Sequence, residues 1–349
     1  MKGVASIAGK ARFLSDLPEP TVSDHDAIVR PILAAATTLD AWRCVAHQSP
    51  SPLILGHQFV GVVERGAHAV GGLAVSTTDS TLVGKRVVVD AAIVCGACPL
   101  CQGGLSSHCR QRKVLGIEDA PGCFAERVGV PVRNLVEVPE SVTSEAALFA
   151  EPLAAAAHAA QLVRLQNKAF VTVVGDSVEA LVTALVMSRH NASVRVLGSA
   201  PDRLTICDRW GLRHRPEREA GRRCDQDVVV ECTGTGEGLT LAMELLRPRG
   251  TLILKHPLAL LPAASRAVNG APANFDHAGV ASRELAVVGA SRGKLSEGVR
   301  LLSTGKLDLS GLISRRVTRA ELPALLTIGA GENAATPPLD QGFRVVVTG

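Results

Sequence analysis

Four cysteines gathered in one short stretch carry the clearest chemistry in the sequence. The stretch CGACPLCQGGLSSHC spaces them C-x2-C-x2-C-x7-C. Two-residue gaps let successive thiolates turn toward one centre, and four sulfur ligands around a tetrahedral ion are typical of structural zinc. An iron–sulfur cluster is an alternative, but a single closed loop with no open position favours zinc. We therefore expect a structural zinc site with the ligands Cys95, Cys98, Cys101 and Cys109.

A single histidine raises a second question about metal binding. The stretch PLILGHQFVGVVE, residues 52–64, places His57 between a glycine and an apolar run typical of a strand. A histidine at such a position is either a metal ligand or a polar residue lining a cleft. One histidine alone does not distinguish these interpretations, so its partners must be found elsewhere in the chain.

Composition excludes several classes of protein. The chain has 349 residues, of which 46% are apolar and 20% charged, as in compact soluble domains. A net charge of +4, with 3% aromatic residues and no Tyr, argues against a nucleic-acid surface. No apolar run reaches the ~18 residues of a membrane span, and no continuous apolar signal segment opens the chain. We therefore expect a cytoplasmic protein, and the scattered remaining cysteines fit a reducing compartment.

The hydrophobic pattern along the chain predicts an α/β fold with two domains. Residues 1–155 contain short β-type segments separated by Gly and Pro. Between 156 and 293, short apolar strands alternate with helical stretches, including helices expected over 178–190 and 238–250. This alternation predicts a parallel sheet covered on both faces. Residues 294–349 read as helix, strand, helix and strand, and we expect them to pack back on the first domain.

Three motifs together resemble the medium-chain, zinc-dependent alcohol dehydrogenase superfamily, closest to its polyol and threonine dehydrogenase-like branch. They are the four-cysteine stretch, GHQFVGVVE and FAEPLAAAAH, followed by a dinucleotide-type region from about 170. The resemblance covers nearly the whole chain. It implies a GroES-like catalytic domain (1–155) with a zinc lobe (95–109), a Rossmann-type cofactor domain (156–293) and a segment returning to the catalytic domain (294–349).

The catalytic zinc site of that family is altered in this chain. The family usually binds zinc through a Cys in a Cys-x-Thr-Asp stretch, the His of Gly-His-Glu, and a further Cys or Glu. His57, Glu151 and Asp40 match that pattern, whereas Thr37 replaces the thiolate and Gln58 replaces an acid. A catalytic zinc needs three protein ligands and one open position, and a neutral hydroxyl is a poor zinc donor. We therefore expect a degenerate site, with His57 and Glu151 as the candidate ligands and zinc bound weakly or not at all.

The stretch VVGDSVEALV occupies the place of the dinucleotide fingerprint G-x-G-x-x-G, between a strand and a helix. Only Gly175 is kept, while Ser177 and Ala180 take the second and third glycine positions. Ala suits the third position because a small side chain still allows the helix to pack on the strand. The residues that we expect to contact a dinucleotide here are Gly175, Asp176, Ser177 and Val178.

The end of the following strand bears on the choice of cofactor. An NAD site expects an acid there to hold the ribose hydroxyls, but the sequence offers Ser199, with Arg203 a turn later. These two residues could bind a 2′-phosphate, so we expect NADP(H) in preference to NAD(H). The alternative, that Arg203 is a solvated helix residue, stays open.

Two further segments are candidates for contacts with cofactor or substrate. The resemblance places Thr233 and Gly234, in the stretch ECTG, near the ribose and nicotinamide. Lys255 follows a predicted strand at its carboxyl end, where ligands bind in open α/β sheets. It is either a donor to a substrate oxygen or a lysine that extends into solvent.

Three hypotheses about function follow, and an enzyme is favoured over a scaffold because the predicted cleft keeps more polar groups than a scaffold needs. The first is an NADP(H)-dependent oxidoreductase that acts on a small alcohol or carbonyl compound with a degenerate zinc site. The second is a conventional zinc-dependent alcohol or polyol dehydrogenase, and the third is a non-catalytic dehydrogenase-like scaffold. The resemblance also implies a homodimer or homotetramer. The catalytic candidates are His57, Asp40, Glu151, Gln58 and Lys255.

Overall fold

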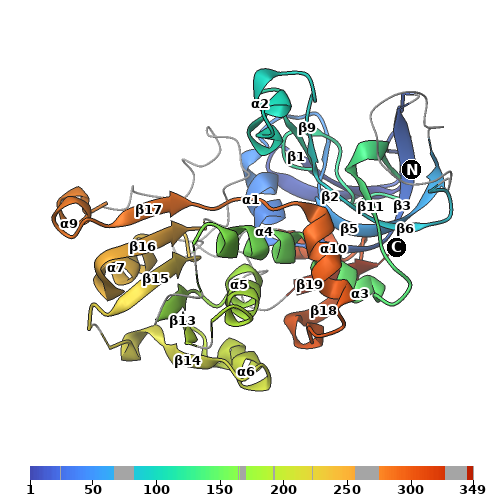
Figure 1. Cartoon of the computed structure of the whole chain (residues 1–349). Helices are drawn as coiled ribbons and strands as arrows, with labels where there is room; N and C mark the ends of the chain where they lie inside the picture. Colours follow the sequence, from blue (N-terminus) through green and yellow to red (C-terminus); the bar gives the residue numbers. More distant parts are fainter. Residues whose placement is uncertain are drawn as a thin grey trace. The chain divides into compact units, whose positions relative to one another are not determined.

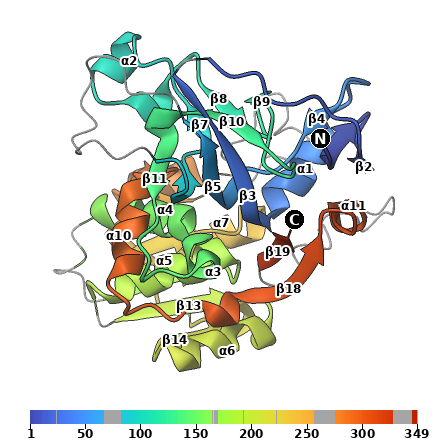
Figure 2. The same cartoon turned by 90° about the vertical axis from the view of Figure 1, so that its right-hand side faces the viewer.

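The structure is a computed structural model that describes residues 1–23, 25–66, 82–163, 165, 170–191, 193–221, 223–255, 275–326 and 344–348. The chain forms two compact units (Figures 1 and 2). The first unit combines Met1–Ala150 with Val299–Gly349, and the second combines Glu151–Leu260 with Arg266–Gly298. A β-rich unit and a parallel-sheet unit confirm the predicted α/β class. The domain bounds at 155 and 293 stay predictions.

The first unit is built on one large sheet and two small ones. The large sheet has the order β11-β6-β5-β3-β19-β18, with β10 also paired to β3, and the small sheets are β2-β1-β4 and β7-β8-β9. Strand β19 pairs antiparallel with β3, so the C-terminal strand belongs to this sheet. The strands are β1 (Gly3–Ile7), β2 (Lys10–Leu14), β3 (Asp26–Ala36), β4 (Leu53–Ile54), β5 (Gln58–Arg65), β6 (Arg86–Val89), β7 (Ala92–Ile93), β8 (Lys113–Leu115), β9 (Asp119–Ala120), β10 (Val128–Pro131), β11 (Leu135–Glu137), β18 (Ile313–Thr318) and β19 (Arg344–Thr348).

Helices of the first unit are short. They are α1 (Thr38–Ala46), α2 (Pro99–Gln102), α3 (Ser144–Ala147) and α11 (Leu322–Leu326). In the central strand β3, Pro31 lies where the register to β5 shifts, because proline has no N–H to contribute to the ladder. The described part of 294–349 runs through α10 (Leu295–Ser303), β18, α11 and β19, the helix–strand–helix–strand order expected from the sequence.

The second unit contains a six-stranded parallel sheet in the order β14-β13-β12-β15-β16-β17. Its strands are β12 (Val171–Val174), β13 (Val194–Gly198), β14 (Arg213–Pro216), β15 (Gln226–Glu231), β16 (Leu246–Leu254) and β17 (Ala286–Gly289). Counted within the unit this is 3-2-1-4-5-6, the order typical of dinucleotide-binding domains. Ligands of such sheets bind at the carboxyl ends of the strands, where the order reverses between β12 and β15.

Helices pack on this parallel sheet and explain its continuous apolar strands. Helix α5 (Val178–Ser188) packs against β12 and β13, α6 (Pro201–Arg209) against β13 and β14, and α7 (Gly236–Leu245) against β15 and β16. All residues of β12 and β15 are buried, as expected for strands covered on both faces. The remaining helices are α4 (Ala150–Gln161), α9 (His277–Ser282) and α10 (Leu295–Ser303).

The structure corrects one expectation in this unit and adds one strand. The helix expected over 238–250 ends at Leu245, and β16 begins at Leu246, because Pro248 cannot continue a helix. Strand β14, with the sequence RHRP, was not expected, because it lacks the apolar residues that signal a strand.

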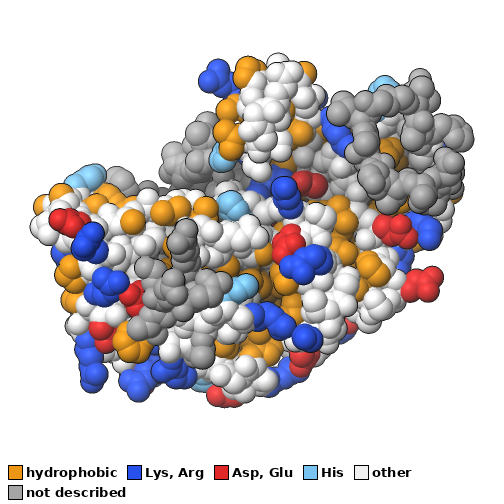
Figure 3. Space-filling view, in the orientation of Figure 1, with side chains coloured by type: hydrophobic (Ala, Val, Ile, Leu, Met, Phe, Trp, Pro, Cys, Tyr) orange, Lys and Arg blue, Asp and Glu red, His pale blue; other side chains and the backbone are white. Residues whose placement is uncertain are grey.

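Surface charge agrees with the composition. On the face shown in Figure 3, Lys and Arg side chains are interspersed with Asp and Glu. Among the described helices, none is both long enough and apolar enough to cross a lipid bilayer.

Candidate functional site

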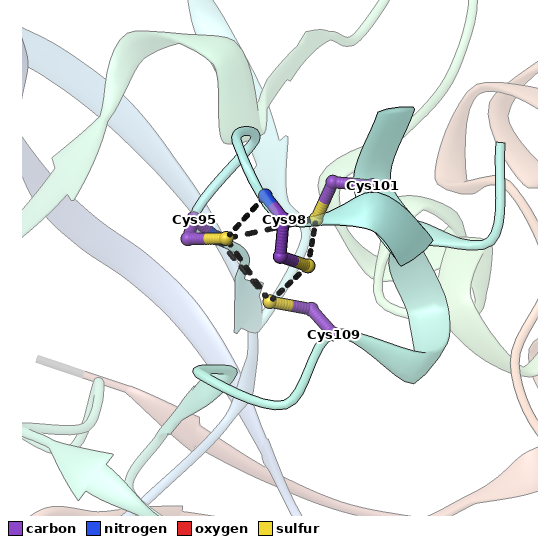
Figure 4. A group of neighbouring side chains, drawn as sticks. All are labelled: Cys95, Cys98, Cys101 and Cys109. Carbon is purple, nitrogen blue, oxygen red and sulfur yellow. Dashed lines mark hydrogen bonds between the residues drawn. The ribbon is translucent and has the colours of Figure 1, made fainter. Parts of the chain in front are cut away.

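The four predicted zinc ligands converge within residues 95–109 of the first unit, here called the cysteine lobe (Figure 4). All four Sγ atoms lie within 4.8 Å of one another, and the hydrogen-bonded pairs are 3.5 to 3.9 Å apart. Thiolates that bind one tetrahedral zinc at ~2.3 Å are separated from each other by about 3.8 Å. The positions of the sulfurs therefore fit a closed zinc site with Cys95, Cys98, Cys101 and Cys109 as its ligands.

Tight turns in the backbone bring these four sulfur atoms close to one centre. Gly96 and Gly104 have φ angles of 74° and 77°, in the left-handed region that favours glycine. Pro99 begins α2, and its fixed φ suits the first position of a helix. Cys98 therefore lies directly before the helix and Cys101 within it, so that one helical turn brings two ligands together.

Hydrogen bonds and burial give Cys95, Cys98 and Cys101 different pKa values. The backbone groups of Ala97 and Cys98 lower the pKa of Cys95 to about 6. A backbone hydrogen bond from Cys101 lowers the pKa of Cys98, whereas burial and the neighbouring thiols raise the pKa of Cys101 to about 12. Because adjacent thiolates repel one another, a cation is needed to hold several of them at one centre. The cysteine lobe therefore suits a divalent metal better than it suits four free thiols.

A buried carboxylate holds His57 in the first unit. Nδ1 of His57 lies 2.9 Å from Oδ1 of Asp40, and the two side chains are 3% and 0% exposed. An ionised carboxylate accepts hydrogen bonds and donates none, so Nδ1 carries the donated proton. Nε2 is then the ring atom suited to bind a metal or to exchange a proton. Asp40 therefore fixes the orientation of the imidazole for either role.

Thr37 supports this carboxylate as the N-cap of α1. Its hydroxyl and its backbone N–H both donate to Oδ2 of Asp40 at 2.8 Å, while its Oγ1 accepts the backbone N–H of Asp40 at 3.4 Å. This capping box satisfies amide groups at the start of the helix. Thr37, which the resemblance predicts to replace the thiolate, therefore donates to the partner of His57. Thr37, Asp40 and His57 are called the His57 network below.

Other polar residues that bear on this site lie on separate segments. Gln58 is the first residue of β5 and is buried, and Glu151 is the second residue of α4, in the second unit. The thiol of Cys44, on α1, lies 3.8 Å from the carbonyl oxygen of Gly9. Within the described part of the first unit, only the cysteine lobe brings three or more potential ligands to one centre. A zinc site shared by His57 and Glu151 stays a prediction.

The fingerprint turn connects β12 to α5 in the second unit. Gly175 has a φ of 120°, a conformation that glycine adopts without strain. Ser177 is the N-cap of α5, and its Oγ accepts the backbone N–H of Ala180 at 3.2 Å. Val178 is the buried first residue of the helix. A helix that begins in this way, at the carboxyl end of the first strand, is suited to bind a pyrophosphate at its N-terminus.

Asp176 changes the expectation for the end of β13. Its Oδ2 accepts the backbone N–H of Ala200 at 2.7 Å and the hydroxyl of Ser199 at 3.2 Å, and its Oδ1 accepts a hydrogen bond from Arg203 at 3.1 Å. The expectation of a strand end without an acid was therefore incomplete, because the preceding turn supplies one. Ser199 and Arg203, which the sequence suggested for a 2′-phosphate, both contact Asp176.

Glu231 organises the next turn, at the end of β15. Its buried carboxylate accepts the backbone N–H groups of Thr233 and Gly234, at 2.6 and 3.1 Å, and also the Thr233 hydroxyl. Gly234 has a φ of 70°. The segment that we expected near the ribose and nicotinamide is therefore a tight turn, whose backbone amides hold a carboxylate of the same segment.

Lys255 directly follows β16, and its backbone N–H donates to the carbonyl oxygen of Glu231 at 2.9 Å. The residue is 8% exposed, which argues against a lysine extended into solvent. Burial raises the pKa of the Cys232 thiol to about 12, and the charge of Lys255 opposes that rise. Lys255 therefore lies beside the carboxyl ends of β15 and β16, and its contact with a substrate stays a prediction.

Sequence reasoning missed the partners of two carboxylates. Glu231 was not proposed for any role, and Asp176 was proposed only as one residue of a turn. A signal for Asp176 was present, because an acid inside the fingerprint places a negative charge next to the pyrophosphate position. Nothing in the sequence indicated that this acid reaches Ser199 and Ala200, which lie more than twenty residues later.

Known proteins resemble this chain over most of its length. Residues 23–140 match the alcohol dehydrogenase GroES-like domain. A relative from Haemophilus influenzae, an uncharacterized zinc-type alcohol dehydrogenase-like protein, is 25% identical over 332 residues, 90% of each chain. An L-threonine 3-dehydrogenase from Chelativorans sp. is 28% identical over 326 residues, 88% of each chain.

A solved structure agrees in fold and shows a bound cofactor. It comes from Sinorhizobium meliloti, is described as a "putative zinc-binding dehydrogenase", and is bound to NADP. Its identity to this chain is 26%, its TM-score is 0.80, and the alignment covers 100% of this chain and 99% of the other. The likeness therefore extends over both units and includes the parallel sheet that carries the fingerprint turn.

Proposed function

We propose that this chain, which belongs to the medium-chain, zinc-dependent alcohol dehydrogenase-like superfamily, moves a hydride between a nicotinamide dinucleotide and a small alcohol or carbonyl compound. One observation carries this proposal. The strands of the parallel sheet have the order typical of dinucleotide-binding domains. Strand β12 is followed by Gly175, which has a positive φ, and then by a helix whose N-cap is Ser177. Retention of this turn favours an enzyme over a non-catalytic scaffold.

The residues of this chain have three tasks in the proposed reaction. The bound nicotinamide supplies the hydride chemistry. The turn from Gly175 to Val178 binds the dinucleotide through backbone amides and the N-terminus of α5. His57, oriented by Asp40, receives or returns the proton of the substrate hydroxyl at Nε2. Lys255 donates a hydrogen bond to the substrate oxygen.

The catalytic zinc site is degenerate in our proposal. In the first unit, the Thr37 hydroxyl donates a hydrogen bond to Asp40. The sequence therefore offers His57 as a candidate ligand but has no cysteine at the position where the family has its thiolate. These donors do not fit the three-ligand site that a catalytic zinc requires. We therefore assign no step of the reaction to a metal. The structural zinc of the cysteine lobe is separate, and there the donor set fits.

A conventional zinc-dependent alcohol or polyol dehydrogenase is the second candidate. The fixed imidazole favours it, because a zinc-binding histidine commonly donates its second ring N–H to a carboxylate, as His57 does to Asp40. In that case His57 and Glu151 hold the zinc together with water.

Zinc content and turnover separate these candidates. Chelator-washed protein is analysed for zinc per chain by elemental mass spectrometry and then assayed for oxidation of a panel of alcohols with NAD⁺ and NADP⁺. About one zinc per chain together with turnover supports the degenerate site, and about two supports the conventional enzyme. Turnover should be lost in His57→Ala and kept in His47→Ala, a control histidine on the same unit that bonds to the carbonyl oxygen of Ser51. Absence of both nicotinamide binding and turnover would contradict the proposal.

The cofactor preference is a finer part of the proposal. NADP(H), predicted from Ser199 and Arg203, is supported by the NADP-bound relative. The contacts of both residues with Asp176 argue against a preference for NADP(H). Assembly into a homodimer or homotetramer, and a cytoplasmic location, stay predictions.

A further inference from the structure

We infer that Asp176 supplies, from the turn after β12, the ribose-binding carboxylate that the end of β13 lacks, and that it makes the site select NAD(H) over NADP(H). This inference rests on the proposed function, because it concerns the adenosine end of the same dinucleotide. It reverses the preference expected from the sequence. It also assigns Asp176 a role in specificity that the fingerprint pattern alone does not give.

The contacts of Asp176 place its charge where an NAD site needs an acid. In such sites the acid stands at the end of the second strand of the unit and accepts the ribose hydroxyls. Ser199 directly follows that strand, and its hydroxyl donates to Oδ2 of Asp176. The backbone N–H of Ala200 and the Arg203 guanidinium hold the same carboxylate. Because Asp176 is buried and bonded on both oxygens, its position is fixed.

Acceptor capacity remains for a ribose. A carboxylate offers about four acceptor positions on its two oxygens. Three are used, by Ser199, Ala200 and Arg203, and two of these lie on Oδ2. Oδ1 can therefore accept one ribose hydroxyl, and the Ser199 hydroxyl can turn to release a second position.

Gly198 makes this arrangement sterically possible. A Cβ at residue 198 would lie 2.7 Å from Cβ and 2.9 Å from Oδ2 of Asp176, closer than real side chains approach. The φ of Gly198 is not in the left-handed region, so backbone conformation is not the reason for glycine here. The missing side chain at the strand end and the acid in the preceding turn are therefore two parts of one arrangement.

Charge around Asp176 disfavours a 2′-phosphate. Burial raises the pKa of Glu217, and the charges of Asp176 and Glu231 raise it further, so these carboxylates are near enough to repel one another. The guanidinium that contacts Asp176 is already paired with it, at 3.1 Å. A phosphate at this position would have to draw Arg203 away from Asp176 and would then lie beside unneutralised carboxylates. Neutral ribose hydroxyls avoid that cost.

A purely structural role for Asp176 is the competing explanation. Ala200 is the N-cap of α6 and has no capping side chain of its own, so the carboxylate of Asp176 acts as a remote cap. A cap affects folding stability and should affect both cofactors equally. The ratio of NADH to NADPH affinity therefore separates the two explanations, because only a contact with the ribose changes it.

The test measures binding of NADH and NADPH by titration calorimetry to the full-length, zinc-loaded protein and to Asp176→Asn. We expect the unmodified protein to bind NADH more tightly. We expect Asp176→Asn to weaken NADH binding roughly tenfold, as for the loss of one charge-assisted hydrogen bond, without weakening NADPH. Asp227→Asn is the matched control, because Asp227 is also buried, accepts a backbone N–H, and pairs with an arginine, at the start of β15. It should leave the ratio unchanged.

A second variant keeps the inference testable if Asp176→Asn does not fold. Arg203→Gln removes the guanidinium, which is 22% exposed. We expect no selective loss of NADPH binding, whereas a phosphate contact would cost NADPH roughly tenfold. Tighter binding of NADPH by the unmodified protein, or equal changes for both cofactors in Asp176→Asn, would overturn the inference and leave the proposed function intact. Binding of neither cofactor would overturn both.

Discussion

The cysteine lobe and the His57 network both contain side chains that can bind zinc, but they are assembled in different ways. In the cysteine lobe four ligands lie within fifteen residues, and turns at Gly96 and Gly104 bring them to one centre. In the His57 network the side chains come from the N-cap and first turn of α1 and from the residue before β5, and they form hydrogen bonds with one another. The comparison shows that side chains able to bind a metal can instead form hydrogen bonds with one another.

The cysteine lobe and the His57 network also differ in their electrostatics. The four thiols repel one another once ionised, so the cysteine lobe needs a cation to balance them. In the His57 network, the Asp40 carboxylate accepts hydrogen bonds from Thr37 and His57, so its charge is stabilised without a metal. Removal of zinc should therefore destabilise the cysteine lobe without unfolding it completely, and should leave the His57 network in place.

The largest expected effect is the loss of a lobe ligand. Cys98→Ser should release the structural zinc and lower the free energy of unfolding by about 4 kcal/mol, because metal binding and folding of such a lobe are coupled. Zinc per chain and urea unfolding measure the two effects. The exposed Cys224 serves as the control, since Cys224→Ser should change neither. Unchanged zinc in Cys98→Ser would show that the lobe does not hold the metal.

The second-largest expected effect, that of Asp40→Ala, tests whether the His57 network is independent of zinc. Asp40→Ala should lower the free energy of unfolding by about 3 kcal/mol, because it leaves buried donors of Thr37 and His57 without an acceptor. Zinc per chain should not change. Asp26→Ala is the matched control, because Asp26 accepts the same kind of bonds from Ser23, three residues earlier, at an exposed site. A fall in zinc content for Asp40→Ala alone would mean that His57 binds metal.

A third variant restores the thiolate of the family. Thr37→Cys should raise zinc content above that of the unmodified protein, because it returns a charged donor to the segment that precedes α1. It should also cost about 1 kcal/mol of stability through loss of the N-cap. Thr37→Ser keeps the cap and should bind no additional zinc. If Thr37→Cys binds no more zinc than Thr37→Ser, the thiolate is not what the site lacks.

The smallest effect concerns the pH dependence of the metal-free cysteine lobe. The pKa of Cys95 is lowered to about 6, so the contribution of its thiolate to stability is full above its ordinary pKa and is lost as the pH falls through about 6. In chelator-treated protein, alkylation of Cys95 should rise with a midpoint near pH 6, because the thiolate is the nucleophile. Cys101, with a pKa raised to about 12, should react last. Peptide mass spectrometry measures both, and equal rates at pH 7 would contradict this order.

Much of the second unit could be predicted because its strands are covered on both faces. Continuous apolar runs such as FVTVVG and DVVVECTG correspond to β12 and β15. Strand β14 was missed because an edge strand can be formed from charged residues, as RHRP is. The helix expected to reach residue 250 ends at Leu245, where the pairing of β16 with β15 takes over. Local pattern gives the kind of element more reliably than it gives the boundary.

The sequence by itself determined the cysteine lobe and the position of the fingerprint turn, because each depends on residue types at short spacing. Only the tertiary structure decided that His57 pairs with Asp40, and that Asp176 reaches the end of β13. The physical reason is that a hydrogen bond between distant segments depends on how the chain brings them together. A carboxylate therefore acquires its role from donors that adjacent sequence does not contain.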